Sequence, residues 1–185
     1  MGMAAVRDIT TIEELLALPE DGRRHELLDG EHVETPAPRW AHQFVLNELN
    51  YALQQVLHDR DDLHVLTSPA DIVLSPRTLV QPDLFVVRRE PGKRIEQWAD
   101  VGVPILAAEV LSPSTASRDR GKKRRLYQQA GVGQYWILDC DARLVERWLP
   151  TDERPEIISD VLLWSLPGGA TGEIDVADMF ERGLR

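Results

Sequence analysis

The sequence contains one cysteine among 185 residues, so no disulfide can form within the chain. Chains without disulfides are typical of reducing compartments. Cys140 follows an apolar segment and precedes Asp141, which favours a packing role at the end of a strand over a nucleophilic one. We therefore expect a cytoplasmic protein.

Long apolar runs are also missing. No stretch approaches the roughly 18–20 apolar residues that cross a bilayer, and Met1 to Thr10 lack the apolar core of a signal peptide. Hydrophobic residues make up 43% of the chain and charged residues 28%, as in ordinary globular proteins. We expect no membrane partner and one domain over residues 1–185.

Positive charge is scarce, because 21 Lys and Arg face 31 Asp and Glu and the net charge is −10. Such a surface repels nucleic acid as a whole, which argues against a protein that coats DNA. An enzyme needs only a local positive site. Residues 118–125 carry six positive side chains against one negative and could supply it.

Apolar periodicity predicts a mixture of helices and strands, an α/β (α+β) protein. Asp29-Gly30 lies between two extended arms and predicts an N-terminal hairpin with a type I′ turn. Helices are predicted at residues 11–18, 39–58, 115–130 and 175–182. Strands are predicted at residues 64–66, 71–74, 79–87, 104–112, 134–139, 144–149, 156–159 and 161–166. The strands within 64–87 are expected to form an antiparallel meander, whereas the strand–helix–strand order of 109–139 predicts a parallel pair.

Two acidic residues lie in these apolar runs, Asp83 in the first and Glu109 in the second. A buried acid is costly unless a cation or hydrogen bonds compensate it. If the two carboxylates lie ~4 Å apart on neighbouring strands, their repulsion is about 4 kcal/mol at an effective dielectric of about 20. Mg²⁺ or Mn²⁺ removes this cost, since hard ions prefer oxygen ligands. A metal there can activate a water for attack on a phosphodiester.

The helix at 115–130 offers a third component, because Asp119, Lys123 and Tyr127 are four residues apart and share a face. A lysine aimed at the metal site supplies positive charge to the attacking water or the phosphorane oxygens. Spacing alone favours a weak surface pair of Asp119 and Lys123. His42 begins an apolar stripe that continues through Leu46, Leu49, Leu53 and Val56. The stripe favours a core histidine over a ligand or substrate contact.

Several spaced motifs resemble the Uma-type restriction endonucleases, a bacterial branch of the PD-(D/E)XK nuclease superfamily. The resemblance covers nearly the whole chain. The motifs are Arg24-His25-Glu26-Leu27-Leu28-Asp29-Gly30-Glu31, His42, Gln81-Pro82-Asp83, Glu109-Val110-Leu111-Ser112-Pro113-Ser114-Thr115, Asp119, Lys123, Tyr127, Gly131, Tyr135-Trp136-Ile137-Leu138-Asp139 and the acidic C-terminal segment.

The resemblance implies a restriction-endonuclease-like mixed sheet flanked by helices. It implies Mg²⁺ (or Mn²⁺) ligation by Asp83 and Glu109, with the backbone carbonyl of Val110 and with Glu26 directly or through water. One position departs from the superfamily pattern, since Leu111 stands where its lysine usually is. The resemblance implies that the lysine has moved to the following helix, at Lys123.

The leading hypothesis is a metal-dependent endonuclease that hydrolyses DNA, with Asp83, Glu109 and Lys123 as its catalytic residues. A homodimer is expected, because cutting both strands of a duplex often uses two active sites. One alternative is a catalytically weak or inactive nucleic-acid or protein-interaction module on the same fold, which the net charge and Leu111 favour. Another is metal-dependent hydrolysis of a different phosphoester.

Overall fold

The computed structural model describes residues 8–35, 37–89, 92 and 94–184. The first seven residues, part of the segment predicted to lack a signal peptide, lie outside the described residues. No helix among the described residues is long and apolar enough to cross a membrane.

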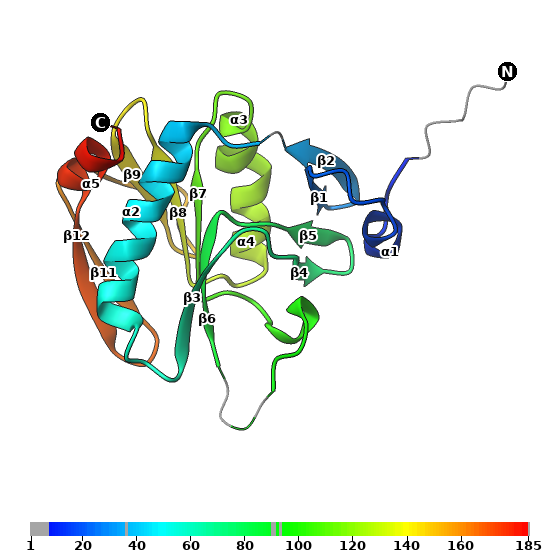
Figure 1. Ribbon diagram of the computed structural model, residues 1–185, viewed down its shortest axis with the longest axis horizontal. Coiled ribbons are helices and arrows are strands. Elements are labelled where there is room, and N and C mark those ends of the chain that lie inside the picture. The colour runs from blue at the N-terminus through cyan, green and yellow to red at the C-terminus, as the bar shows by residue number, and fades with distance from the viewer. Residues whose placement is uncertain (1–7, 36, 90–91, 93, 185) are drawn as a thin grey trace, which may run out of the picture.

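A six-stranded mixed sheet forms the centre of the molecule (Figure 1), in the order β10-β9-β8-β7-β6-β3. β7 and β8 are parallel and the other neighbouring strands are antiparallel. A parallel pair needs a long crossover, so the predicted parallel pair is confirmed. The strands are β3 (Leu63–Thr67), β6 (Leu84–Arg88), β7 (Leu106–Val110), β8 (Gln134–Asp139), β9 (Leu144–Trp148) and β10 (Glu156–Ile158).

One face of this sheet packs on α2 (Trp40–Leu57), α5 (Val176–Gly183) and a hairpin of β11 (Val161–Leu166) and β12 (Ala170–Asp175). Their apolar side chains form one continuous core with the sheet. The predicted stripe on α2 is wrong at its last position: Val56 is 38% exposed, and Leu57 is buried instead.

The opposite face carries the helical crossover between β7 and β8. Its parts are α3 (Ala116–Arg118), a wide π-turn η2 (Asp119–Lys123) and α4 (Arg124–Gln129). The crossover ends at Gly131, where φ is +79°. Glycine adopts this left-handed conformation without steric cost and commonly terminates helices. The predicted helix at 115–130 is therefore confirmed in position but contains a π-turn.

A second, four-stranded antiparallel sheet lies beside the crossover, in the order β2-β1-β5-β4. Its hairpin turns at Asp29 and Gly30, whose φ angles of 52° and 76° are the positive values that a type I′ turn needs. The predicted hairpin is confirmed. The strands are β1 (Arg24–Leu28), β2 (Glu31–Thr35), β4 (Ile72–Ser75) and β5 (Thr78–Val80), and the short helices are α1 (Ile12–Leu16) and η1 (Trp98–Asp100).

The predicted meander is wrong, because residues 79–87 form two strands in different sheets. β5 pairs with β4 and β1, whereas β6 pairs with β3 and β7. The break falls at Pro82, which has no N–H to donate to a ladder. Ser68 holds the break by donating its hydroxyl to the Pro82 carbonyl at 2.8 Å. The chain thus crosses between sheets immediately before Asp83.

Candidate active site

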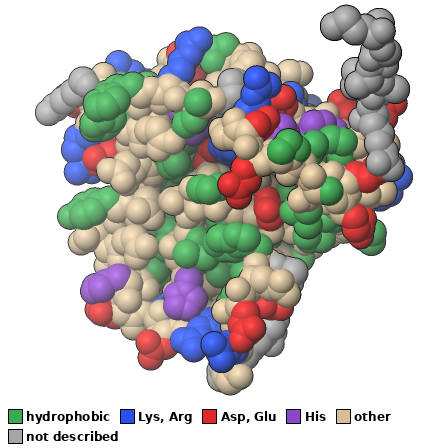
Figure 2. All heavy atoms as spheres, turned by 45° about the vertical axis from the view of Figure 1, so that its right-hand side comes forward, with side chains coloured by type: hydrophobic (Ala, Val, Ile, Leu, Met, Phe, Trp, Pro, Cys, Tyr) green, Lys and Arg blue, Asp and Glu red, His purple; other side chains and the backbone are tan. Residues whose placement is uncertain are grey.

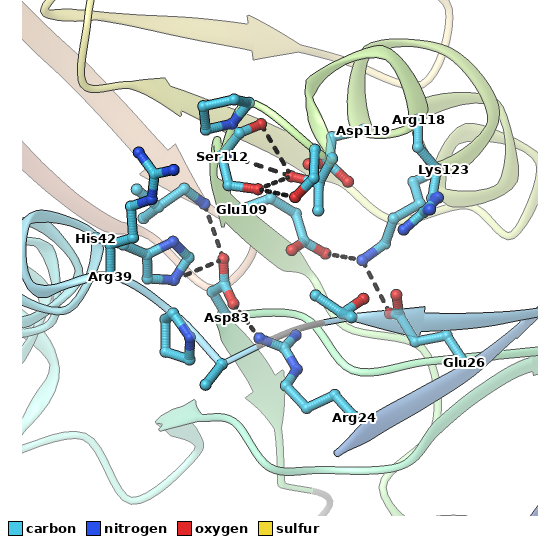
Figure 3. Close-up of a pocket in the computed structure, with 17 residues that line it drawn as sticks. Arg24, Glu26, Arg39, His42, Asp83, Glu109, Ser112, Arg118, Asp119 and Lys123 are labelled. Carbon is cyan, nitrogen blue, oxygen red and sulfur yellow. Dashed lines mark hydrogen bonds and ion pairs between the residues drawn. The ribbon is translucent and has the colours of Figure 1, made fainter.

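Asp83 and Glu109 are opposite one another at the edge of the β6–β7 pair. The antiparallel register pairs Leu84 with Ala108, so the next step outward brings the two acids together. Side chains alternate between the faces of a strand, which directs both acids to the face covered by the helical crossover. Both are buried and line one cavity of about 310 Å³ (Figure 3).

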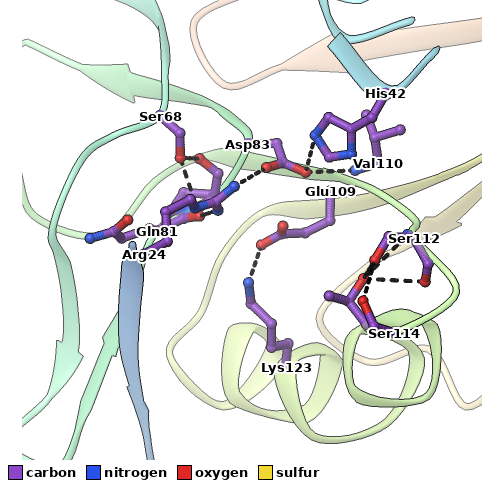
Figure 4. Close-up of polar contacts among 12 residues, drawn as sticks. Arg24, His42, Ser68, Gln81, Asp83, Glu109, Val110, Ser112, Ser114 and Lys123 are labelled. Carbon is purple, nitrogen blue, oxygen red and sulfur yellow. Dashed lines mark hydrogen bonds and ion pairs between the residues drawn. The ribbon is translucent and has the colours of Figure 1, made fainter. Parts of the chain in front are cut away.

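Three groups compensate Asp83 (Figure 4). Arg24 Nη1 donates to Oδ1 at 2.7 Å, and the Val110 amide donates to Oδ2 at 2.9 Å. His42 Nε2 lies 3.3 Å from Oδ2. Burial raises the pKa of Asp83, but His42, Arg24 and the Val110 amide outweigh burial and hold the pKa below its ordinary value. Asp83 is therefore ionised.

Glu109 is less well compensated. Lys123 Nζ lies 2.6 Å from its Oε1, and the Tyr127 hydroxyl donates to the same oxygen at 3.0 Å. Burial nevertheless raises the pKa of Glu109 well above its ordinary value, and repulsion from Asp83, Asp119 and other nearby carboxylates adds to the rise, against the attraction of Lys123. Glu109 is the carboxyl group that favours a proton when no further cation is present.

Lys123 is 2% exposed, so the expectation of a weak surface pair with Asp119 is wrong. Its Nζ lies 2.9 Å from Glu26 Oε1 as well as 2.6 Å from Glu109. Burial lowers the pKa of Lys123, but the charges of Glu109 and Glu26 outweigh burial and raise the pKa. The π-turn, in which the Arg124 amide donates to the carbonyl of Asp119, places Lys123 inside the fold. Such π-turns occur frequently at functional sites.

Glu26 reaches the cavity from β1 of the smaller sheet. Its Oε1 also accepts a hydrogen bond from the Gln81 amide at 2.7 Å. The Gln81 side chain turns away from the cavity and donates to Asp71 at 2.8 Å. Glu26 thus joins the cluster, whereas Gln81 contributes its backbone.

Asp119 and Tyr127 are both buried, as Lys123 is. Asp119 lines the cavity, and burial raises its pKa. Tyr127 packs behind the cavity, and burial together with Glu109 raises the pKa of its hydroxyl well above the ordinary value. The hydroxyl therefore remains a donor that orients Glu109.

His42 lies at the first turn of α2 and lines the cavity beside Asp83. His42 was expected to be an ordinary core histidine, and this prediction is wrong because the side chain lines a cavity beside a carboxylate. The apolar stripe that predicted it begins four residues later, at Leu46.

The buried end of the cavity carries more negative than positive charge. The lining holds four buried acids, Glu26, Asp83, Glu109 and Asp119, and one buried cation, Lys123, while Arg24, Arg39 and Arg118 lie at more exposed positions. Among the described residues, no group of three or more His, Cys, Asp or Glu side chains is already arranged to hold a metal. Lys123 Nζ lies between the carboxylates of Glu26 and Glu109.

Sequence reasoning missed the roles of Arg24, Arg39 and Arg118, which line the cavity. Arg24 could have been found, because it stands two residues before Glu26 on β1 and residues at that spacing share a face. Arg39 and Arg118 come from segments that meet only in the folded chain, so no spacing indicates them.

Most of the basic run forms contacts within the protein. Arg120 donates to Asp139 at 2.7 Å and to Glu146 at 2.6 Å, Lys122 pairs with Glu31, and Arg124 stacks on a tryptophan. On the face in Figure 2, basic and acidic side chains are interspersed and form no continuous basic surface. The run as a whole is therefore no nucleic-acid platform.

The fold is shared with a nuclease-like protein of known structure. A crystal structure described as a "putative nuclease belonging to DUF820", from Anabaena variabilis, matches with a TM-score of 0.78 and 21% identity over 94% of this chain and 98% of that one. An uncharacterised protein of Synechocystis sp. is 22% identical over 180 residues, which is 97% of this chain and 98% of the relative. The model of the Uma2 family, described as "putative restriction endonuclease", matches residues 12–170. The chain belongs to the Uma2 family, which supports a nuclease-type function and confirms the family and fold predicted from the sequence.

Proposed function

We propose that the protein is a Mg²⁺- or Mn²⁺-dependent endonuclease that hydrolyses DNA phosphodiester bonds. The observation that carries the proposal is the pairing of Asp83 and Glu109 at the buried end of a cavity, where four buried acids face one buried cation, Lys123. A divalent cation would offset this excess of buried negative charge. Without that cation the raised pKa of Glu109 favours a proton in its place.

The donor set fits a hard divalent ion, because its members are carboxylate and carbonyl oxygens. We assign Asp83 and Glu109 as ligands, together with the Val110 carbonyl and with Glu26 directly or through water. A Mg²⁺ or Mn²⁺ ion held there would lower the pKa of a water and offset charge on the phosphate. Asp83 is oriented for this role by Arg24 and the Val110 amide, and Glu109 by Tyr127.

Lys123 supplies a buried positive charge next to Glu109. Charge held in a dry site acts strongly on charge that develops in the transition state. We assign Lys123 to the attacking water or to the phosphorane oxygens and exclude it from the ligands. Arg39 and Arg118 line the same cavity at more exposed positions than Lys123, and we assign them to contacts with the phosphate backbone.

Two further features belong to the same proposal. Each chain has one such cavity assigned to cleavage, so cutting both strands of a duplex calls for a homodimer. A cytoplasmic setting fits a chain with a single cysteine, Cys140, which forms no disulfide within the chain.

A plasmid-cleavage assay with Mg²⁺ or Mn²⁺ tests the proposed activity. We expect nicking and linearisation by the unmodified protein and none by Asp83→Ala. Cleavage that persists in Asp83→Ala would contradict the assignment.

One observation favours a second candidate, a non-catalytic interaction module. Lys123 Nζ lies between Glu26 and Glu109 and forms an ion pair with each of them without a metal. Mn²⁺ titration separates the two candidates. A folded protein that binds no Mn²⁺ at millimolar concentration supports the interaction module, whereas saturable binding supports the enzyme.

A further inference from the structure

A second cavity, of about 490 Å³, opens directly beside the candidate active site. The two cavities share Arg24, Thr35, Ala37, Pro38 and Asp83. One wall of the second cavity comes from α2 and another from Ser68 and its neighbours after β3. We call this cavity the amide groove, because Gln43, Asn47 and Asn50 line it. Its volume lies within the range of small-molecule sites.

The amide side chains that line the groove lack hydrogen-bond partners among the residues that the structure describes. Gln43, Asn47 and Asn50 follow one another at steps of four and three, which places them on one face of α2. None of their side chains forms a hydrogen bond with another residue that the structure describes. By contrast, Gln54 on the same helix donates to the Val65 carbonyl. The groove therefore presents amide donors and acceptors to whatever enters it.

Two residues that line the amide groove have a buried polar atom that also lacks a partner within the described part of the chain, Arg24 Nε and Gln81 Oε1. Buried polar atoms are nearly always hydrogen-bonded, so unpaired ones call for a partner from outside the protein.

Exposed aromatic side chains lie on the same helix. Trp40 is 73% exposed, and its ring centre lies 4.6 Å from that of Phe44. Trp40, Gln43, Phe44 and Asn47 are three or four residues apart and lie on neighbouring parts of the helix surface. Exposed aromatic rings stack with nucleobases in a way that tolerates any sequence.

We propose that the amide groove binds a nucleobase of the polynucleotide, next to the phosphodiester that lies in the active site. Asn and Gln amides match the adenine edge, which offers one donor and one acceptor side by side. The inference rests on the proposed nuclease function and adds a source of base preference. It assigns Gln43, Asn47 and Asn50 to recognition and leaves hydrolysis to Asp83, Glu109 and Lys123.

Two measurements on a DNA pool with randomised sequence test this inference. The first maps the cut ends that the protein produces with Mn²⁺, and the second selects bound DNA in EDTA, where cleavage does not occur. The Gln43→Ala/Asn47→Ala double variant is compared with Gln55→Ala, since Gln55 is an exposed glutamine of α2 that does not line the groove. The cleavage rate summed over all sequences serves as the reference.

We expect a preference for one base at a fixed distance from the cut, with adenine favoured about 10-fold or more. The double variant should lose that preference, whereas Gln55→Ala should keep both the preference and the summed cleavage rate. A preference that survives in the double variant, or the lack of any preference, overturns the inference. If no DNA is cut, the proposed function fails. The inference is then decided by the DNA bound in EDTA, through the base preference of the unmodified protein, the double variant and Gln55→Ala.

Discussion

Glu109 depends on its neighbours more than any other side chain of the cavity. One of its oxygens contacts Lys123 at 2.6 Å and the Tyr127 hydroxyl at 3.0 Å, and the nearby acids Asp83, Asp119 and Glu26 repel its charge. A single buried lysine shared with Glu26 does not balance the local charge. The chemistry of the site therefore depends on whether a proton, a lysine or a metal compensates Glu109.

Replacement of Lys123 by Met tests the role of its charge. Two buried carboxylates lose their cation, so the free energy of unfolding in EDTA should fall by about 3–5 kcal/mol. Mn²⁺ should recover much of this loss and bind at least as tightly as to the unmodified protein, while turnover falls about 100-fold or more. Denaturant unfolding and single-turnover cleavage measure these effects.

The neighbouring Lys122→Met is the matched control, because Lys122 pairs with Glu31 at the surface. It should change stability by less than about 0.5 kcal/mol. If turnover is equal in Lys123→Met and Lys122→Met, Lys123 takes no part in catalysis and its role is structural.

Glu109 also predicts a pH dependence. Its pKa in the metal-free fold is raised above the ordinary 4.5, so between 4.5 and the raised pKa the folded protein holds a proton that the unfolded chain has lost. The metal-free protein therefore becomes more stable as pH falls through this window. Mn²⁺ must displace the same proton, so the Mn²⁺-induced rise in Tm should shrink over the same window.

Thermal unfolding in EDTA and in Mn²⁺ at a series of pH values measures both effects. The Glu109→Gln variant should lose the part of the pH dependence of stability that comes from Glu109. It should keep the part that comes from Asp119, whose pKa is also raised. A Mn²⁺-induced rise in Tm that is the same at about pH 8 and about pH 5.5 is incompatible with a protonated Glu109.

At the scale of elements, Arg120 joins the crossover to the sheet. Its guanidinium bonds Asp139 at the end of β8 and the buried Glu146 of β9. Arg120→Ala leaves Glu146 buried without its cation, which should cost about 1–3 kcal/mol. Denaturant unfolding measures the loss. Arg125→Ala is the control, because Arg125 is exposed and its replacement should change the free energy of unfolding by no more than about 0.5 kcal/mol. Equal losses of stability in the two variants would show that Arg120 does not stabilise the contact between the crossover and the sheet.

Local patterns predicted the elements that local forces determine. Asp29-Gly30 fixes its hairpin through backbone conformation, and the apolar spacing of α2 fixes a helix that ends within one residue of the prediction. The break at Pro82 was missed because apolar residues continue on both sides of it. The sheet to which each half belongs depends on pairing with distant strands, which periodicity does not encode.

The site was predictable where one strand or one motif carries it. Asp83 and Glu109 were identified because acids are costly in apolar runs, and Glu26 came from the family resemblance. Burial of Lys123 was not predictable from four-residue spacing, since it depends on the π-turn and on contact with β1. The amide groove escaped notice because α2 and the loop at Ser68 meet only in the fold.

At the scale of the whole molecule, the candidate site joins the two larger sheets. Arg24 and Glu26 come from β1 of the smaller sheet, and Glu109 comes from β7 of the larger one. Contacts across this junction include Arg24 with Asp83 at 2.7 Å. A ligand shared by these residues would tie the sheets together.

Hydrogen exchange tests this coupling. If Mn²⁺ is bound by residues of both sheets, amide exchange in Arg24–Leu28 should slow when Mn²⁺ is added, because binding to the folded state alone stabilises it. The slowing should be lost in Asp83→Asn. Protection confined to β6 and β7 would show that the smaller sheet takes no part in binding.

Crystals soaked with Mn²⁺ test the central claim most directly, through the anomalous scattering of the metal. The account predicts a Mn²⁺ peak between Asp83 and Glu109, with oxygen ligands from both and with Lys123 Nζ outside the coordination sphere. A peak elsewhere, or no peak between the two carboxylates at saturating Mn²⁺, would contradict the account.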